Sequence, residues 1–295
     1  MMYKVDNAVI MAAGFSSRFA PLSLEKPKGL IEVKGEILIE RQIRQLKDAG
    51  ISRIILVTGY MQECFDYLRK KFGVILVSNP EYRSRNNNGS IWAARDYLGN
   101  SYVCSSDNYF VSNPFESEIE GAYYAALYAE GQTDEWCMKE GSDGFISSVT
   151  IGGENSWYML GHTFWDRPFT EQFLAILEQE YLLPKTKAKL WEQIFREHLD
   201  VLKMRIRRYA DGEILEFDTL DELRTFDESY LDDTRSPILK HIAAELSISE
   251  RDIRSIQVHQ DENGETDGFQ FQGKDSCYKY LYASNEIKKV STEWK

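Results

Sequence analysis

The 295-residue sequence has only four cysteines and four histidines. The cysteines (Cys64, Cys104, Cys137 and Cys277) form no C-x-x-C pair and have no histidine at metal-binding spacing. Such scattered thiols are typical of a reduced, cytoplasmic protein and argue against a disulfide framework. With so few histidines, a zinc enzyme is not expected.

Long apolar runs and basic tracts are also missing. No segment approaches the roughly 20 apolar residues that a transmembrane helix needs, and the N-terminus, MMYKVDNAVIM, has no basic region before a long apolar core. We therefore expect no signal peptide and no membrane association. The net charge of −12, without a basic tract, argues against nucleic acid as a partner.

The segment over residues 12–30, AAGFSSRFAPLSLEKPKGL, follows a short apolar strand. Gly14 ends the strand, and the loop after it combines backbone N–H groups and serine hydroxyls with the cations Arg18 and Lys28. Such a loop suits a polyanion such as a nucleoside triphosphate. It matches neither the GxxxxGK[ST] loop nor the GxGxxG fingerprint, and a solvated basic loop is the alternative.

Buried strands alternate with helices in the first hundred residues. The spacing of apolar residues predicts a helix over 38–49 and strands over 54–58, 74–77 and 101–106. This alternation predicts a doubly wound, Rossmann-like α/β fold with a mixed, mostly parallel sheet, which binds ligands at the carboxyl ends of its strands.

The pattern changes to alternation between residues 136 and 165, which predicts an antiparallel insertion with a hairpin turn at Gly152-Gly153. Two helices are expected after it, over residues 170–181 and 189–202.

Polar side chains follow two of the predicted strands. In the segment RNNNGS, Asn87 and Ser90 suit a base edge or a ribose, although a polar loop with a helix cap at Ser90 is equally compatible. Asp107 follows the strand over 101–106, where a metal bound to phosphate would sit. The alternative for Asp107 is an Asx-turn that closes the strand.

Two further carboxylates alternate with apolar residues in the segment ILEFD, so Glu216 and Asp218 point to one face of a strand. Asp218 could instead cap a helix, and Thr219 with Glu222 resembles a capping box. Capping leaves Glu216 unexplained, whereas a metal shared with Asp107 explains both carboxylates.

The first loop resembles the signature of nucleotidyltransferases that make sugar nucleotides and CDP-alcohols. The pattern AAG-x-[GS]-[ST]-R-x-x-P-L-[ST]-x-x-x-P-K is carried by Ala12, Ala13, Gly14, Ser17, Arg18, Pro21, Leu22, Ser23, Pro27 and Lys28. Ser16 departs from it, because most of the family has a second glycine there. The segments SYVCSSDNYF, TDEWCM, LGHTFWDRP and ILEFDTLDELRTFD are similar to those of bacterial CTP:phosphocholine cytidylyltransferases, and this resemblance covers about residues 3–230.

The resemblance implies that phosphocholine attacks the α-phosphorus of CTP in line, which gives CDP-choline and pyrophosphate. It assigns Lys28 and Arg18 to phosphate contacts and catalysis, and Mg²⁺ to Asp107, Glu216 and Asp218. The nucleotide-binding residues would be Ala12, Ala13, Gly14, Ser17, Asn87 and Ser90. The resemblance assigns the acceptor pocket to Trp136 and residues 190–192. A trimethylammonium group needs aromatic faces and carboxylates, which Trp136, Trp165 and Trp191 with Glu135 or Glu192 could supply.

The acceptor segment departs from the family pattern at two positions. Leu190 stands where the family tends to have tyrosine, and Glu192 where it has aspartate. Phosphoethanolamine, another phospho-alcohol or a sugar 1-phosphate therefore remain alternative acceptors, and the tryptophans are equally typical of a core. An alternative of another class is a nucleotide-binding regulatory protein without turnover.

We expect residues 1–228 to form the nucleotidyltransferase domain and residues 229–295 a small α+β appendage. The appendage would have a polar linker near 232–237, a helix over 238–246, a second helix from Ser249 and a hairpin over 264–282. It weakly resembles the start of the small lobe of choline kinases. We expect it to take no part in catalysis and to offer a sheet edge for a homodimer.

Overall fold

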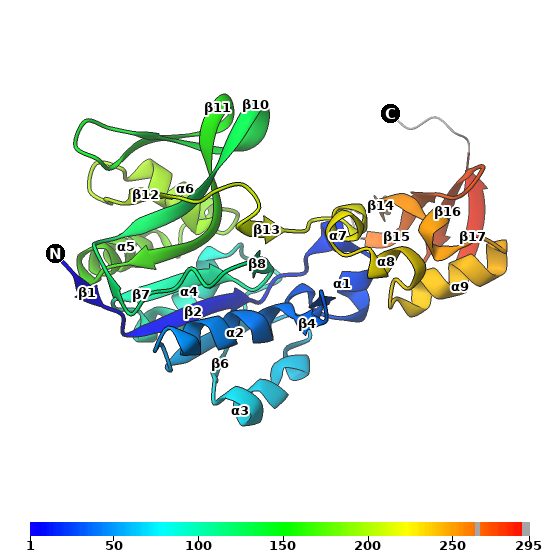
Figure 1. Cartoon of the computed structure of the whole chain (residues 1–295), viewed down its shortest axis with the longest axis horizontal. Coiled ribbons are helices and arrows are strands. Elements are labelled where there is room, and N and C mark those ends of the chain that lie inside the picture. Colours follow the sequence, from blue (N-terminus) through cyan, green and yellow to red (C-terminus); the bar gives the residue numbers. More distant parts are fainter. Residues whose placement is uncertain (263–265, 291–295) are drawn as a thin grey trace. The chain divides into compact units, whose positions relative to one another are not determined.

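The computed structural model describes residues 1–262 and 266–290, and the chain divides into two compact units (Figure 1). Unit 1 comprises Met1–Gly14 and Leu38–Glu216, and unit 2 comprises Phe15–Ile37 and Phe217–Lys295. The signature loop therefore belongs to the same compact unit as the C-terminal tail. The units do not coincide with a boundary at residue 228, so the predicted domain division stays a prediction.

A mixed sheet of seven strands lies at the centre of unit 1. Its order is β12 (Arg205–Arg208), β10 (Tyr123–Glu140), β11 (Ile146–Trp165), β7 (Ser101–Ser105), β2 (Asn7–Ala12), β5 (Ile54–Thr58) and β6 (Ile75–Ser78). The last four strands are mutually parallel, whereas β11 runs antiparallel to both of its neighbours. This confirms the predicted α/β sheet.

The order in which the chain adds strands to the sheet reverses at β2. From β2 the chain continues to β5 and β6 on one side and then crosses to β7 on the other side. The N–H of Ser106 donates to the carbonyl of Met11 at 3.1 Å, which keeps the carboxyl ends of β7 and β2 together. Chain connections diverge at such a switch point and leave room for a ligand. Ala13 and Asp107 follow these two strands.

Helices cover both faces of the sheet. On one face, Ala94 packs against Val9 and Val57, and Ile91 packs with Val103 in the larger core that also contains Phe173. The helices of that face are α4 (Asn88–Ala94), α5 (Arg167–Glu180) and α6 (Trp191–Glu197). On the opposite face lies α2 (Leu38–Asp48), whose apolar side is buried (Figure 1).

Shorter elements complete unit 1. They are α3 (Tyr67–Phe72), β1 (Tyr3–Lys4) with β9 (Glu118–Ile119), and β8 (Asn108–Phe110) with β13 (Ile214–Glu216). The described residues contain no helix that is long and apolar enough to cross a membrane.

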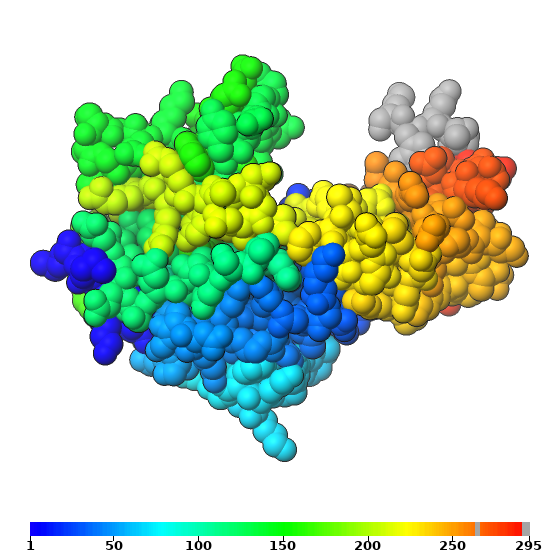
Figure 2. Space-filling view, viewed as in Figure 1, coloured from blue at the N-terminus to red at the C-terminus, as the bar shows by residue number. Residues whose placement is uncertain are grey.

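The antiparallel insertion differs from its prediction. It is one long hairpin of β10 and β11, whose far end stands out from the body of unit 1 (Figure 2). The turn lies at residues 141–145, where the N–H of Gly141 donates to the carbonyl of Phe145 at 2.8 Å. Gly152 and Gly153 lie inside β11, so the predicted turn there is wrong. Gly152 has a φ of 77° beside an irregular register, which is the geometry of a β-bulge.

Unit 2 combines short elements of the signature loop with the tail. The loop contains α1 (Leu22–Glu25), β3 (Glu32–Val33) and β4 (Glu36–Ile37). Next comes α7 (Leu220–Phe226), and the tail from residue 229 contains α8 (Ser229–Asp232), α9 (Pro237–Leu246) and an antiparallel sheet of β14 (Arg254–Gln260), β15 (Thr266–Gln272), β16 (Cys277–Leu281) and β17 (Glu286–Val290).

The predicted linker over residues 232–237 is mostly exposed, although Thr234 and Ser236 within it are both 0% exposed. One expectation for the tail is wrong. The predicted helix at Ser249 is a single 3₁₀ turn with a capping box, after which Ile256 lies in β14. The predicted hairpin is confirmed as β15 and β16, although its first residues, 264 and 265, lie outside the described residues.

Candidate active site

Three predicted site residues of unit 2 form one group of ion pairs. The guanidinium of Arg18 lies 2.7 Å from one carboxylate oxygen of Asp218, and the ammonium of Lys28 lies 3.3 Å from the other. The side chain of Lys28 is only 5% exposed, whereas that of Arg18 is 75% exposed. A buried ammonium needs a counter-charge, which Asp218 supplies. The structure therefore joins both predicted catalytic cations to a predicted metal ligand.

The capping alternative for Asp218 is wrong. Thr219 is the N-cap of α7, and its hydroxyl accepts from the N–H of Glu222 at 3.2 Å. The Glu222 carboxylate in turn accepts from the N–H groups of Asp218 and Thr219. The capping box is thus confirmed, but the Asp218 side chain is not part of it and faces the two cations.

The loop that carries these cations holds one unusual conformation. Ser16, which replaces the family's second glycine, has φ 48° and ψ 51°, in the left-handed region that glycine adopts most easily. The next residues, Ser17 and Arg18, line a pocket together with Thr219, before α7, and Gln257 of the tail. A side chain at Gly14 would meet no atom of the described residues within 4 Å, so there is open space beside it.

The remaining predicted nucleotide-binding residues lie in unit 1. Ala12 ends β2 and Ala13 follows it, and the Ala13 carbonyl accepts from the N–H of Tyr60 at 3.1 Å. A pocket at the carboxyl ends of β5 and β6 is lined by Tyr60 and Asn79, among others. The amide of Asn79 donates to the hydroxyl of Ser90 at 3.3 Å, so Ser90 is linked to this pocket.

Asn87 contacts the segment that was predicted to bind the acceptor. Its amide nitrogen donates to Glu192 at 3.0 Å, and its amide oxygen accepts from the N–H of Trp191 at 2.7 Å. The hydroxyl of Tyr124 donates to the other oxygen of Glu192 at 3.3 Å. Burial raises the pKa of Glu192 to about 6, and hydrogen bonds from Asn87 and Tyr124 offset this only in part. Sequence reasoning missed Tyr124, because nothing distinguishes it from other apolar strand positions.

The three predicted acceptor tryptophans have different surroundings. Trp165 is 0% exposed and contacts the rings of Phe169, Phe173 and Trp191. Trp191 is 1% exposed and stacks on Tyr124. Both side chains belong to the core, as the alternative interpretation held, and neither offers an open ring face for a ligand. Trp136 is partly buried, and the guanidinium of Arg196 lies 5.4 Å from its ring centre.

Two predicted metal ligands also lie in unit 1. Glu216 ends β13 directly opposite Asn108 of β8, whose amide donates to the Glu216 carboxylate at 3.3 Å. Asp107 immediately precedes Asn108, so pairing of β8 with β13 brings both carboxylates to one end of this small ladder. The third predicted ligand, Asp218, belongs to unit 2. Carboxylate oxygens are the donors that Mg²⁺ prefers.

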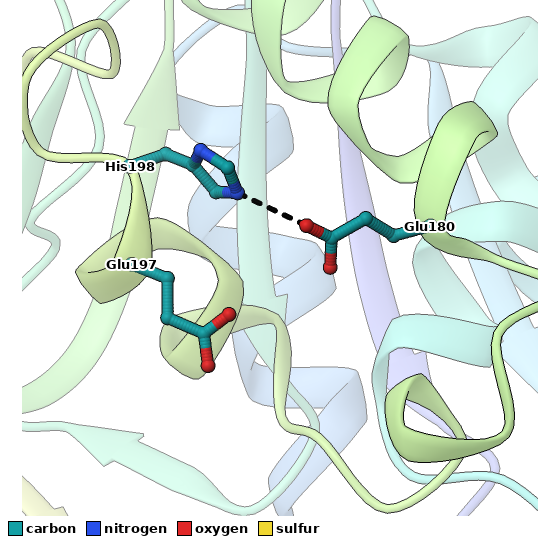
Figure 3. A group of neighbouring side chains, drawn as sticks. All are labelled: Glu180, Glu197 and His198. Atoms are coloured by element: carbon teal, nitrogen blue, oxygen red, sulfur yellow. Dashed lines mark hydrogen bonds and ion pairs between the residues drawn. The ribbon is translucent and has the colours of Figure 1, made fainter.

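A different set of metal-binding side chains gathers where α5 and α6 end. Glu180, Glu197 and His198 lie close enough to share one ion, and the ring of His198 faces the Glu180 carboxylate at 3.1 Å (Figure 3). The ammonium of Lys189, however, contacts both glutamates and supplies the positive charge. We therefore interpret the group as an ion-pair network that ties α5 to the helix carrying Glu192.

Comparisons with known proteins identify relatives of the chain. Residues 8–126 match the family model described as a MobA-like NTP transferase domain. The chain is 32% identical over 222 residues to the choline-phosphate cytidylyltransferase of Streptococcus pneumoniae, covering 75% of this chain and 97% of that protein. It is also 32% identical over 229 residues to the 2-aminoethylphosphonate cytidylyltransferase of Lancefieldella rimae, covering 76% of this chain and 93% of that protein.

A solved structure supports the fold. The CTP:phosphocholine cytidylyltransferase from Streptococcus pneumoniae superposes with a TM-score of 0.73 at 32% identity, covering 77% of this chain and 99% of that chain. The predicted nucleotidyltransferase fold is confirmed. About a quarter of this chain has no counterpart in that structure.

Proposed function

This chain belongs to the family of bacterial choline-phosphate cytidylyltransferases, and we propose that it converts CTP and phosphocholine to CDP-choline and pyrophosphate. The observation that carries this proposal is the ion-pair group of Arg18, Lys28 and Asp218, which combines the cations of the nucleotidyltransferase signature with a carboxylate.

The proposed reaction needs no covalent intermediate. An oxygen of the phosphocholine phosphate forms a bond to the α-phosphorus of CTP, the bond from that phosphorus to the bridging oxygen breaks, and pyrophosphate leaves. The phosphate dianion is already a nucleophile, so no general base is required. Lys28 and Arg18 would hold the triphosphate and offset the charge that develops on its oxygens.

Nucleotidyltransferases of this family generally use a divalent metal ion. We propose that the ion is Mg²⁺, held by Asp107, Glu216 and Asp218, because the family resemblance assigns them and all three offer carboxylate oxygens. When bound, Mg²⁺ would neutralise charge on the phosphates.

The acceptor would bind near Glu192 and Trp136. A trimethylammonium group cannot donate a conventional hydrogen bond, so an aromatic face and a carboxylate are its suitable partners. Arg196 already lies over Trp136, so a choline group would have to displace its guanidinium from that face or use the other face.

A primary amine is a second candidate. The relative from Lancefieldella rimae, whose name gives 2-aminoethylphosphonate as its substrate, matches this chain at the same 32% identity. The Glu192 carboxylate, held by Asn87 and Tyr124, could accept hydrogen bonds from an amine in the same way. Phosphoethanolamine and 2-aminoethylphosphonate are therefore the competing acceptors.

A pyrophosphate-release screen tests the proposal. The four nucleoside triphosphates would each be combined with phosphocholine, phosphoethanolamine, 2-aminoethylphosphonate and glucose 1-phosphate. We expect CTP with phosphocholine to have the highest kcat/KM. A tenfold preference for an amine acceptor, about 1.4 kcal/mol, would change the acceptor but not the reaction class. Binding of CTP without turnover on any acceptor would support the regulatory alternative.

Other expectations stay predictions. They are a cytoplasmic location, no nucleic-acid partner, and a homodimer through the edge strands of the tail sheet. Light scattering of the purified chain would test the dimer.

A further inference from the structure

The signature segment, defined here as residues 15–37, lacks stable structure of its own. Its α1 has four residues and its strands β3 and β4 have two each. Elements this short do not hold their shape without tertiary contacts. Because Arg18 and Lys28 lie on this segment, their positions must be fixed by residues elsewhere in the chain.

The first contact that fixes the segment is at Glu25. Its carboxylate accepts from the hydroxyl of Ser236 at 3.0 Å and from the N–H of Ile238 at 2.9 Å. These donors lie at the N-terminus of α9, where a carboxylate is favoured by the helix dipole and by the unpaired N–H groups. Ser236 is 0% exposed.

Two more contacts lie beyond Lys28. The carbonyl of Glu32 accepts from the hydroxyl of Tyr230 at 2.6 Å and from the guanidinium of Arg235 at 3.3 Å. The N–H of Lys34 donates to the Asp227 carboxylate at 2.7 Å. Tyr230 and Asp227 are both almost fully buried, at 1% and 4% exposed. The segment is therefore held on both sides of Lys28.

We propose that residues 227–238, which include the start of the tail, position the signature segment so that Lys28 and Arg18 meet the triphosphate. This inference rests on the proposed function and deepens it. Tyr230, Arg235 and Ser236 are positioning residues, since they act through the segment and not on the substrate. This positioning role opposes our expectation that the tail takes no part in catalysis.

Point variants in the full chain test the proposal. Tyr230→Phe removes one hydroxyl and keeps the ring, and we expect kcat to fall by about tenfold while KM for CTP changes by less than about twofold. Glu25→Ala removes the partner of Ser236 but leaves that hydroxyl free to cap α9 through the N–H of Leu239. Lys288→Ala is the matched control in the tail, because Lys288 pairs with Glu286 of its own strand; it should leave kcat unchanged.

A double-variant cycle shows whether the contact itself matters. If Glu25 and Ser236 act through one interaction, the double variant Glu25→Ala with Ser236→Ala loses no more activity than the more damaging single variant. Restoring a hydroxyl with Ser236→Thr should recover most of the activity lost in Ser236→Ala. Fully additive losses would contradict the proposal.

Hydrogen exchange gives a readout that does not depend on the reaction. In the ligand-free protein, amides of residues 15–37 should exchange faster in Tyr230→Phe and Glu25→Ala than in the parent chain and in Lys288→Ala. Unchanged exchange and unchanged kcat in both variants would overturn the positioning role even if the parent is an active transferase. A parent without transferase activity, but with faster exchange in the variants, would overturn the proposed function and leave the tail's support of the segment intact.

Discussion

The ammonium of Lys28 donates to the carboxylate of Asp218 at 3.3 Å, although 190 residues separate them in the sequence. Lys28 is buried, and the side chain of Asp218 is 31% exposed. The Lys28 ammonium is therefore held against a carboxylate inside unit 2 before any substrate binds. A preorganised charge of this kind stabilises a transition state without a further cost of reorganisation.

The first prediction concerns Lys28. Lys28→Ala should lower kcat by about a hundredfold with a much smaller effect on the affinity for CTP, because charge develops on the phosphate oxygens during transfer. Steady-state kinetics and calorimetric CTP titration separate the two effects. Lys26→Ala is the matched control, since Lys26 is an exposed cation of the same loop. A change in KM alone would mean that Lys28 only binds the nucleotide.

The second prediction concerns the metal. Asp107→Asn keeps the size of the side chain and removes its charge, so turnover should fall by at least about a hundredfold and the Mg²⁺ concentration for half-maximal activity should rise. Asp96→Asn is the control, because Asp96 is 81% exposed and lies on the helical turn after α4. Turnover in excess chelator, or an unchanged Mg²⁺ titration in Asp107→Asn, would contradict the assignment.

The third prediction concerns Glu192, whose pKa is raised from 4.5 to about 6 by burial. A raised acid pKa means that the folded state favours the neutral form. The stability from this group is complete below pH 4.5 and is lost as the pH rises through about 6. Glu192→Gln cannot ionise, so its stability relative to the parent should rise over that window, by at most about 2 kcal/mol.

Urea unfolding at several pH values measures this difference. Glu180→Gln is a control of opposite sign: burial raises the pKa of Glu180, but hydrogen bonds from His198 and Lys189 outweigh burial and lower it. The stability from Glu180 is present above pH 4.5 and is lost as the pH falls through its lowered pKa. A stability difference for Glu192→Gln that stays flat between pH 4 and about 7 would mean that Glu192 is not desolvated.

Local patterns in the sequence predicted much of the fold. The strand over residues 54–58 was predicted with both of its bounds, and the helix over 38–49 differs by one residue, because buried apolar runs and amphipathic spacing are short-range signals. The turn at Gly152-Gly153 was wrong because a bulge and a turn both favour glycine with positive φ. Sequence alone does not distinguish these two uses.

Contacts between distant segments could not be predicted. The hydroxyl of Tyr230 donates to the carbonyl of Glu32, 198 residues away, and every residue has a carbonyl, so the acceptor has no signal in the sequence. The contact between the Glu25 carboxylate and the start of α9 has no signal in the sequence either. The segment over 232–237 resembles a linker because it is polar and mostly exposed, yet the hydroxyls of its buried residues Thr234 and Ser236 pair with Glu250 and Glu25. Pairing of this kind becomes visible only in three dimensions.

The last prediction concerns Arg224 of α7. Through this side chain, the stability of residues 217–226 depends on the tail. Its guanidinium, in a side chain 5% exposed, donates to the carbonyls of Tyr230 at 3.2 Å, Glu250 at 2.8 Å and Ile253 at 2.5 Å. An ammonium cannot reach three carbonyls in this fork geometry. Arg224→Lys should therefore lower the free energy of unfolding by about 2–3 kcal/mol.

Chemical unfolding measures this loss in Arg224→Lys, with Arg251→Lys as the matched control. The side chain of Arg251 is 50% exposed and pairs with Asp232, so its replacement should change stability by less than about 0.5 kcal/mol. A chain that ends at residue 228 would lose all three carbonyl acceptors of Arg224, together with the donors to Glu25 and Glu32. We therefore expect such a truncation to lower both the stability of α7 and the turnover number. Equal, small losses of unfolding free energy in Arg224→Lys and Arg251→Lys would show that α7 does not depend on the tail. A truncated chain with parental stability and kcat would restore the interpretation of the tail as a separate appendage.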